Sequence, residues 1–308
     1  MIRKLVTFVV FILVAALACD AQQSDVALLK LVGRVKTITE HSYEVVKGDG
    51  KLINELKTTS KYVFDKRGNK LKEEIRNADG SLESRSALFY SPGGLLEQED
   101  TYNADGSPGF TNMYTYNQDS DLASVMVYNS SGNLFLKTVC SYDAKGNETS
   151  ETNYLPVTET DHKIRTQLQN VTVWQRDAQG RPIKEQLLEG GRTVIKTTTY
   201  SYDTKGNLTE HIESENGVTL KTTYKYDNKN RQIEEVRYDA FDVADMRLAI
   251  VYDEHGNETE VSSYDKDDRM QAISIYKLTY DKQGNWIKKV QNDNERTTGI
   301  VDREIEYY

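Results

Sequence analysis

The chain has 308 residues and a formal net charge of −9, with 39 Lys and Arg against 48 Asp and Glu. This acidity argues against a nucleic-acid partner, because phosphate binding relies on clustered Lys and Arg. Hydrophobic residues make up 37% of the chain and include 20 Tyr against 7 Phe, which predicts a core rich in tyrosine.

The first residues, MIRKLVTFVVFILVAALACDAQQ, have the pattern of a secretory signal. Arg3 and Lys4 precede an apolar run from Leu5 to Leu17, and small residues follow. The run is shorter than the roughly 18–20 apolar residues that a spanning helix needs. We therefore expect residues 1–18 to be a signal peptide and the protein to be exported. Without Arg3 and Lys4 the chain keeps 37 basic and 48 acidic residues, a net charge of −11.

The site of cleavage has two interpretations. Ala16-Leu17-Ala18-Cys19 resembles a bacterial lipobox with its first two positions exchanged, which makes Cys19 a candidate for lipidation. Simple cleavage after Ala18 or Ala21 is the alternative. The only other cysteine is Cys140, so no internal disulfide forms if Cys19 is lipidated or removed. A lipid anchor on Cys19 is the only membrane contact that we expect. Residues 19–30 are predicted to be a linker, and residues 31–308 a single β domain.

A repeat of about 26 residues dominates the rest of the chain. Each unit contains a turn, usually opened by Asp, and these turn-opening residues are separated by 26, 26, 26, 34, 26, 24, 26 and 28 residues. The nine positions are Asp65, Ser91, Asn117, Asp143, Asp177, Asp203, Asp227, Asp253 and Asp281. Every step is even, and even changes in length preserve cross-strand pairing in a hairpin. The spacing therefore favours hairpins over helices.

The residues of these turns match backbone requirements. In seven units, the residue three positions after the turn-opening residue is Gly. Ser120 and Asn230 occupy this position in the other two units. Asp opening a turn and Gly closing it is typical of a type I turn followed by a residue with positive φ. Such hairpins commonly carry a β-bulge at the Gly. The motif is thus explained by geometry without any catalytic role.

In each unit, two residues of the strand that leads into the turn lie on one strand face, and together they form an aromatic ladder. Residues one and three before the turn point to the same side, because side chains alternate along a strand. One position before stand Phe64, Tyr90, Tyr116, Tyr142, Arg176, Tyr202, Tyr226, Tyr252 and Tyr280. Three before stand Tyr62, Leu88, Tyr114, Cys140, Trp174, Tyr200, Tyr224, Ile250 and Leu278. The positions between them mix polar and apolar residues. We expect the ladder to be buried.

A second turn divides most units, as in NADGS at Asn77 and Asn103, NSSGN at Asn129, SENGV at Ser214 and DKDDR at Asp265. Each unit is therefore predicted to be two strands of an antiparallel meander with nearly twenty strands in total. Sheets wider than about 10 strands curl or split. We expect an all-β fold of tandem antiparallel hairpins, curled into a tube or spiral, with a sandwich as a further possibility.

The tandem motif Tyr-Asp-x-x-Gly-Asn/Arg resembles the YD repeat of rearrangement-hotspot (RHS) and teneurin-type proteins. Tyr and Asp are both present at residues 142–143, 202–203, 226–227, 252–253 and 280–281, and the resemblance covers about residues 60–290. The stretch from Leu31 to Leu52 resembles the start of short exported YD-repeat proteins of Bacteroidetes-type bacteria. In large members the repeats form a shell around a toxic C-terminal domain. This chain ends on the strand-like REIEYY, and we expect it to lack such a cargo domain.

Two positions depart from the repeat. The long step from Asp143 to Asp177 places extra residues at Tyr154–Ile164, where Pro156 is expected to break strand pairing and produce a protruding loop. Cys140 occupies a ladder position and is expected to be a buried, chemically quiet thiol.

Sequence motifs for catalysis or metal binding are missing. The four histidines have no H-x-x-x-H spacing, and there is no C-x-x-C, nucleophile elbow or phosphate-binding glycine loop. Asp119 and Asp121 lie in a turn that could hold calcium, although a solvated turn fits their oxygen count better. We assign no catalytic or metal-binding residue and expect no cofactor.

The sequence leaves several functions open. The first is a non-enzymatic scaffold of the cell envelope that binds a glycan or an envelope protein, since Tyr suits both contacts. The alternative is a structural or assembly protein of the envelope without a small ligand. A second alternative is a hydrolase with an unrecognised pair of carboxylates. Exposure of several Tyr side chains in one concave groove would favour the binding scaffold.

Overall fold

The computed structural model describes residues 25–48, 51–158 and 164–308. One short helix, α1 (Asp25–Leu28), precedes a 20-stranded antiparallel sheet and falls within the segment expected to be a linker. The strands are β1 (Val35–Gly48), β2 (Lys51–Phe64), β3 (Lys70–Asn77), β4 (Leu82–Tyr90), β5 (Leu96–Tyr102), β6 (Pro108–Tyr116), β7 (Leu122–Tyr128), β8 (Leu134–Tyr142), β9 (Glu148–Thr158), β10 (Ile164–Arg176), β11 (Pro182–Glu189), β12 (Thr193–Tyr202), β13 (Leu208–Glu215), β14 (Val218–Tyr226), β15 (Gln232–Tyr238), β16 (Ala244–Tyr252), β17 (Glu258–Asp265), β18 (Met270–Tyr280), β19 (Trp286–Asp293) and β20 (Arg296–Tyr307).

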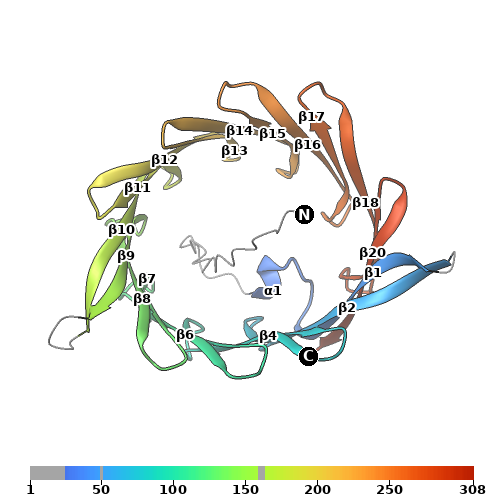
Figure 1. The fold of residues 1–308 in the computed structure, drawn as a ribbon, viewed down its shortest axis with the longest axis horizontal. Helices are drawn as coiled ribbons and strands as arrows, with labels where there is room; N and C mark the ends of the chain where they lie inside the picture. Colours follow the sequence, from blue (N-terminus) through green and yellow to red (C-terminus); the bar gives the residue numbers. More distant parts are fainter. Residues whose placement is uncertain (1–24, 49–50, 159–163) are drawn as a thin grey trace, which may run out of the picture.

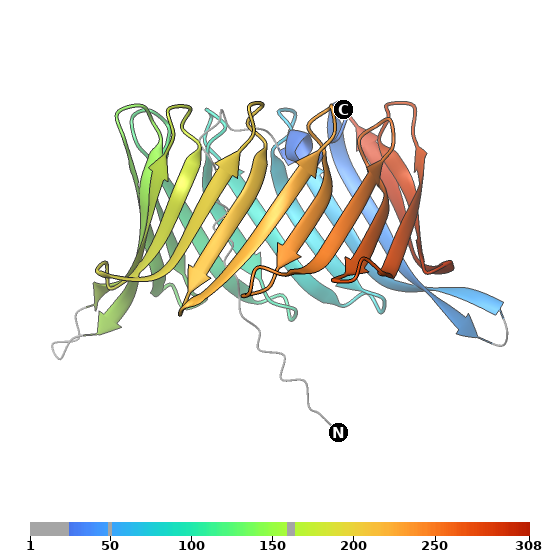
Figure 2. The same cartoon turned by 90° about the horizontal axis from the view of Figure 1, so that it is seen from above.

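The sheet closes on itself into a tube. Each strand pairs with the next along the chain, and β1 pairs with both β2 and β20. The β1–β20 seam runs from the pair Val35↔Tyr307 to the pair Glu44↔Gly299. Figure 1 shows the resulting ring and Figure 2 the tilt of its strands. The predicted all-β meander of hairpins is confirmed as a tube, and closure gives every strand of the described sheet a partner on both sides along part of its length.

The two kinds of turn lie at opposite ends of the tube. The turns opened by Asp65 and its eight equivalents, here called the repeat turns, lie at the same rim as α1 and the C-terminus (Figure 2). The second turns form the opposite rim, here called the hairpin rim. The β1–β2 and β9–β10 hairpins extend furthest at that rim (Figure 2).

The repeat turns have the predicted chemistry. In the turn from Asp203, the carboxylate Oδ1 accepts hydrogen bonds from the backbone N–H of Lys205 and of Asn207, both at 2.9 Å. Gly206 has a φ of 90°, and the non-glycine residues Ser120 and Asn230 take the same place with φ of 71° and 61°. The register shifts by one residue next to the turn, as at Ser201/Tyr202, which is the predicted bulge.

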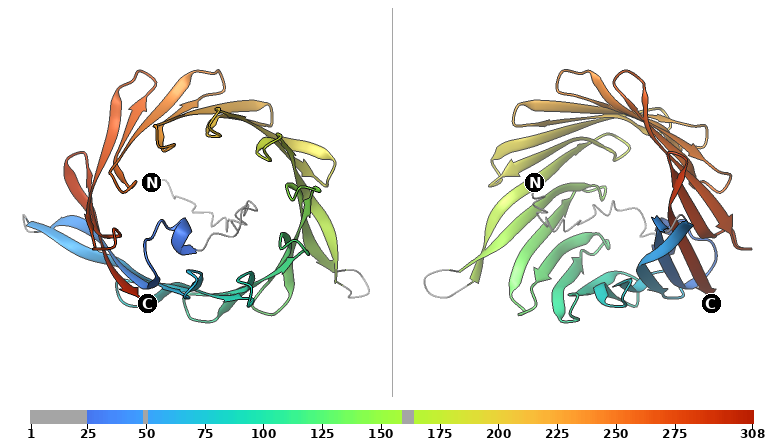
Figure 3. Two further views of the ribbon diagram at one scale, coloured as in Figure 1. Left: turned by 180° about the vertical axis from the view of Figure 1, so that it is seen from behind. Right: turned by 45° about the vertical axis from the view of Figure 1, so that its right-hand side comes forward.

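The aromatic ladder faces the inside of the tube. Helix α1 lies within the ring in two opposite views (Figures 1 and 3), and its Val26 packs in a cluster with Phe64 of the ladder. Tyr90 Oη also lies 3.3 Å from the Asp25 carboxylate of α1. The alternate positions, such as Phe89 and Val251, are exposed and therefore form the outer face.

In the described part of the chain, one small cluster of buried hydrophobic side chains forms, at the seam. Val26, Val35, Ile38 and Phe64 are buried there, against Leu31, Tyr62, Ile305 and Tyr307. Across the described residues only seven hydrophobic side chains are buried, and most ladder side chains are half-buried. The expected burial of the ladder is therefore partial, because a single rolled sheet has no second layer to cover its inner face.

The expectation for the irregular unit is wrong in one respect. Pro156 lies within β9 and pairs with Thr166 of β10, so it does not break the pairing. The pairing of β8 with β9 extends only to Tyr154, and beyond it β9 has a strand on one side only. Proline is tolerated at such an edge, where its missing N–H is not needed. The extra residues thus lengthen a hairpin, and 159–163 lie outside the described residues.

Candidate binding pocket on the inner wall

The tyrosines directly before the repeat turns connect neighbouring repeats. Tyr116 Oη donates to the carbonyl of Leu96 at 2.8 Å, and Tyr252 Oη donates to that of Gln232 at 2.7 Å. The accepting carbonyl belongs to the first strand residue after the preceding repeat turn. The same bond is made by Tyr90, Tyr142, Tyr202 and Tyr226. These hydroxyls are used in the wall, so the ladder as a whole is structural.

Two tyrosines near the C-terminus, Tyr280 and Tyr307, bond to the carboxylates of repeat turns instead. Tyr280 Oη donates to the Asp253 carboxylate and accepts from Asn257 Nδ2 at 3.0 Å. Tyr307 Oη makes the corresponding bond to Asp281. Burial, followed by the hydrogen bond to Asp253, raises the pKa of Tyr280 to about 12. Both phenols therefore stay protonated near neutral pH and act as donors.

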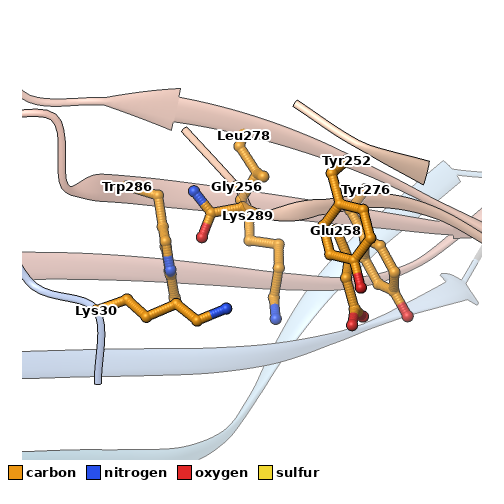
Figure 4. A pocket seen from close by; sticks show the side chains of 9 residues that line it. Lys30, Tyr252, Gly256, Glu258, Tyr276, Leu278, Trp286 and Lys289 are labelled. Carbon is orange, nitrogen blue, oxygen red and sulfur yellow. The ribbon is translucent and has the colours of Figure 1, made fainter. Parts of the chain in front are cut away.

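A hollow of about 310 Å³ opens on the inner wall at strands β16 to β19 (Figure 4). It is lined by Lys30, Tyr252, Gly256, Asn257, Glu258, Tyr276, Leu278, Trp286 and Lys289. Lys30 comes from the segment that follows α1 inside the tube. In Figure 4 the ends of Lys30 and Lys289 point into the same part of the hollow, with Glu258 and Tyr276 beside them. Aromatic rings and charged groups thus converge in one concave place.

Among the described residues, the charged groups of this pocket have no ion-pair partner. Within residues 25–48, 51–158 and 164–308, no carboxylate lies within ion-pair distance of Lys30 or Lys289, and no cation lies within it of Glu258. The Lys289 ammonium instead lies 5.6 Å from the ring centre of Tyr276 and 5.4 Å from that of Trp286. Such contacts stabilise a cation weakly and leave its N–H donors available to a ligand.

Trp286 is held in place from the neighbouring strand. The Arg303 guanidinium lies 3.3 Å from the centre of the Trp286 ring. Arg303 in turn donates to Glu40 across the seam. The indole is therefore fixed by a paired, mostly buried cation, and it offers a rigid apolar wall to the pocket.

Reasoning from sequence missed this pocket, although a signal was present. Three inward-facing positions of the last unit differ from those of the other repeats: Trp286, Lys289 and Tyr276. Five residues after the turn-opening position stand Lys70, Leu96, Leu122, Glu148, Pro182, Leu208, Gln232, Glu258 and Trp286. Eight residues after it stand Glu73, Glu99, Val125, Glu151, Glu185, His211, Glu235, Val261 and Lys289. Comparing the repeats at these positions would have marked Trp286 and Lys289.

Cys140 is half-buried rather than fully buried, so that part of the expectation is wrong. It borders a hollow of about 580 Å³ near Tyr142 and Lys145. Partial burial, with Glu148 and Glu151 nearby, raises the pKa of its thiol to about 12. Because the thiolate is the reactive form, the expected low reactivity stays a prediction with a physical basis.

The other residues singled out from the sequence are Asp119, Asp121 and Cys19. Asp121 is buried and accepts from Asn117 Nδ2 at 2.9 Å, whereas Asp119 is exposed, so the two carboxylates have different surroundings. In the part of the chain that the structure describes, no group of three His, Cys, Asp or Glu side chains is placed to hold a metal. Cys19 and the signal segment 1–18 lie outside the described residues.

Among the described residues, no helix has the length and apolar character needed to cross a membrane.

The rolled sheet and its turns define a shell built from YD repeats. The family model of the teneurin YD-shell matches residues 25–303, and the chain belongs to this family. No curated protein matches the chain.

Similar solved structures include a TcdB2–TccC3–Cdc42 complex, with 15% identity over 84% of this chain and 16% of that chain, at a TM-score of 0.32. This chain thus spans less than a fifth of that relative. A porin-like protein from Bacteroides uniformis is 13% identical over 89% of this chain and 98% of that chain, at a TM-score of 0.37. The Photorhabdus luminescens Tc holotoxin pore is 13% identical over 80% and 19% of the two chains, at 0.25.

Proposed function

We propose that this YD-shell protein is an exported scaffold of the cell envelope that binds carbohydrate on its inner wall without catalysis. The observation that carries the proposal is the pocket at β16–β19. Three aromatic side chains there, Tyr252, Tyr276 and Trp286, surround a hollow of about 310 Å³. The charged groups beside them have no ion-pair partner in the part of the chain that the structure describes. Small-molecule sites are concave, mostly aromatic or apolar, and contain a few oriented polar groups. Their volumes begin at about 300 Å³.

The pocket supports binding better than the ladder does. Most ladder hydroxyls are engaged in the bonds between repeats, as with Tyr116 and Leu96. By contrast, in the described residues the phenol of Tyr276 and the indole N–H of Trp286 have no hydrogen-bond partner. A ligand with hydroxyl groups would supply partners to both. Export and location in the envelope rest on residues 1–18, and attachment to a membrane rests on Cys19.

A specific feature supports the alternative of an assembly protein. Large apolar side chains are exposed along the hairpin rim, and Phe241 is the most exposed, at 87%. Others near the turns of this rim are Leu52, Val194, Val218, Val243 and Met270. Exposed apolar groups gathered along one edge suit contact with another protein. In this reading the tube would be a spacer, and its inner wall would have no ligand.

Binding of purified protein to arrayed bacterial envelope glycans, followed by calorimetry on the glycans retained, tests the proposal. We expect binding that is lost in Trp286→Ala and kept in Phe89→Ala, a change on the outer face. Absence of any glycan binding would refute the carbohydrate role and favour assembly. Turnover of a bound glycan would refute the non-enzymatic role.

A further inference from the structure

One position of the pocket at β16–β19 carries a charge opposite to that of the same position in most repeats. Eight residues after the turn-opening position, five of the nine repeats carry Glu, and the last repeat carries Lys289. The side chain at this position faces the inside of the tube, because it pairs with a ladder residue, as Glu73 does with Tyr62 and Lys289 with Leu278. A cation therefore occupies a place that is acidic in most of the tube.

A second cation is brought to the same place by the segment after α1. Lys30 has a φ of 54°, and its N–H donates to the Ala27 carbonyl at 2.9 Å. Two residues on, the backbone of Val32 is held by the buried side chain of Asn285, which accepts from Val32 N–H at 2.7 Å and donates to its carbonyl at 2.8 Å. Asn285 directly precedes Trp286, so the position of Lys30 is coupled to the pocket that it lines.

These two cations meet an aromatic surface and further polar groups. Lys289 lies between the rings of Tyr276 and Trp286, and the Glu258 carboxylate and the Asn257 side chain complete the lining. The two ammonium groups, which have no carboxylate partner within the described residues, match a carboxylate of a ligand. The remaining groups match the hydroxyls and the apolar face of a sugar ring.

We propose that this pocket binds an acidic saccharide, a sugar whose ring carries a carboxylate. The carboxylate lies between Lys30 and Lys289, the ring lies against Tyr276 and Trp286, and Glu258 and Asn257 bind hydroxyl groups. This inference rests on the proposed carbohydrate role and specifies its ligand. At the equivalent position of other repeats, Glu99, Glu151 and Glu185 present a carboxylate, and Glu73 and Glu235 are ion-paired with Lys70 and Arg237. Among these equivalent sites, the last repeat is therefore the one that offers a cation to an anionic ligand.

The test is calorimetric titration with oligosaccharides of uronic acids, namely glucuronate, galacturonate and mannuronate oligomers, beside the neutral oligomers of the same length and linkage. The protein is the exported chain in its native form and three variants, Lys30→Met, Lys289→Met and Lys277→Met. Lys277 is the matched control, because it lies on the neighbouring strand β18 and is exposed on the outer face. Circular dichroism verifies that each variant is folded.

We expect at least one uronate oligomer to bind and its neutral counterpart to bind at least tenfold more weakly. Lys30→Met and Lys289→Met each reduce affinity about tenfold, the loss expected for one hydrogen bond between charged groups, and Lys277→Met has no effect. Affinity also falls with rising salt, because the contact is ionic.

Equal binding of acidic and neutral oligomers would overturn the acidic ligand and leave the carbohydrate role standing. If Lys30→Met and Lys289→Met both bind the uronate oligomer with unchanged affinity, the ligand does not bind at this site. Absence of binding to every oligomer, together with an empty glycan array, would overturn the proposed function itself.

Discussion

Arg303 and Glu40 form the closest ionic contact across the seam of the tube, with Arg303 Nε and Nη2 donating to Glu40 Oε1 at 2.8 and 2.5 Å. The two residues lie opposite each other on β20 and β1, the last and first strands of the described sheet. Their side chains are only 12% and 19% exposed. Because the same guanidinium lies against Trp286, this pair connects closure of the tube to the geometry of the pocket.

Removing Glu40 should weaken the seam. Glu40→Ala leaves Arg303 buried without its partner, and we expect a loss of about 3 kcal/mol in the free energy of unfolding. The matched control is Glu306→Ala, which breaks the pair of Lys36 and Glu306 across the same seam, with side chains 51% and 67% exposed. That exposed pair should contribute less than about 1 kcal/mol. Urea unfolding followed by circular dichroism measures both, and equal losses would contradict the structural role of the buried pair.

The tyrosine bonds between repeats should each contribute to stability. Tyr116→Phe removes the donor to the Leu96 carbonyl, and we expect a loss of about 1 kcal/mol with an unchanged fold. Phe64 already occupies the equivalent place in the first repeat, so the substitution fits sterically. Tyr276→Phe is the control, because its hydroxyl has no partner among the described residues. A loss as large for Tyr276→Phe would show that the hydroxyl bonds do not connect the repeats.

The turn carboxylates should make the protein sensitive to acid. Hydrogen bonds from Asn207, first from its side chain and then from its backbone, hold the pKa of Asp203 below its ordinary value. A carboxyl whose pKa is lowered by folding stabilises the protein above its unfolded pKa of about 3.9, and this contribution is lost as pH falls through the folded pKa. Melting temperatures recorded from pH 7 to pH 2 should therefore decline below about pH 4.

Substitution of the same residue separates its shape from its charge. Asp203→Ala should lower the melting temperature at pH 7 by about 2 °C, through loss of the bonds to the turn. Asp203→Asn should lower it less, because Asn117 accepts the two backbone bonds through Oδ1 in the third repeat, and only the bond from the Asn207 side chain is lost. Asp203→Asn should also show a weaker decline in acid. A decline as steep as in the unchanged protein would mean that this turn does not contribute to the acid sensitivity.

The thiol of Cys140 should react slowly. Its pKa is raised to about 12 by partial burial and by Glu148 and Glu151, so the thiolate fraction is very small at pH 8. We expect a thiol reagent to label the folded protein at least a hundredfold more slowly than the protein unfolded in urea. Glu151→Gln should increase the labelling rate modestly. Complete labelling of the folded protein within seconds would contradict this assignment.

Much of the fold could be predicted because it is local chemistry repeated. The turn from Asp203 to Gly206 is set by a side chain bonding its own backbone and by a residue with positive φ, and both are visible in the sequence. Alternation along each strand places Tyr202 and Tyr200 on one face. The even spacing then preserves the pairing from one repeat to the next.

Closure and the pocket depend on contacts between distant residues, which the repeat does not reveal. Whether the sheet forms a tube or a spiral is decided by the pairing of β1 with β20, and Glu40 and Arg303 are 263 residues apart. Lys30 reaches the pocket only because Asn285 holds Val32 from 253 residues away. The pairing of Pro156 departs from the sequence prediction for a similar reason: proline is tolerated there because β8 ends before it, which the local sequence does not reveal.

A crystal structure of the protein grown with a bound uronate oligosaccharide is the most direct test of the central claim, a closed tube that binds sugar on its inner wall. We expect a ring closed by the β1–β20 pairs, with the carboxylate between the ammonium groups of Lys30 and Lys289. An open or spiral sheet, or a sugar bound only on the outer face, would contradict it.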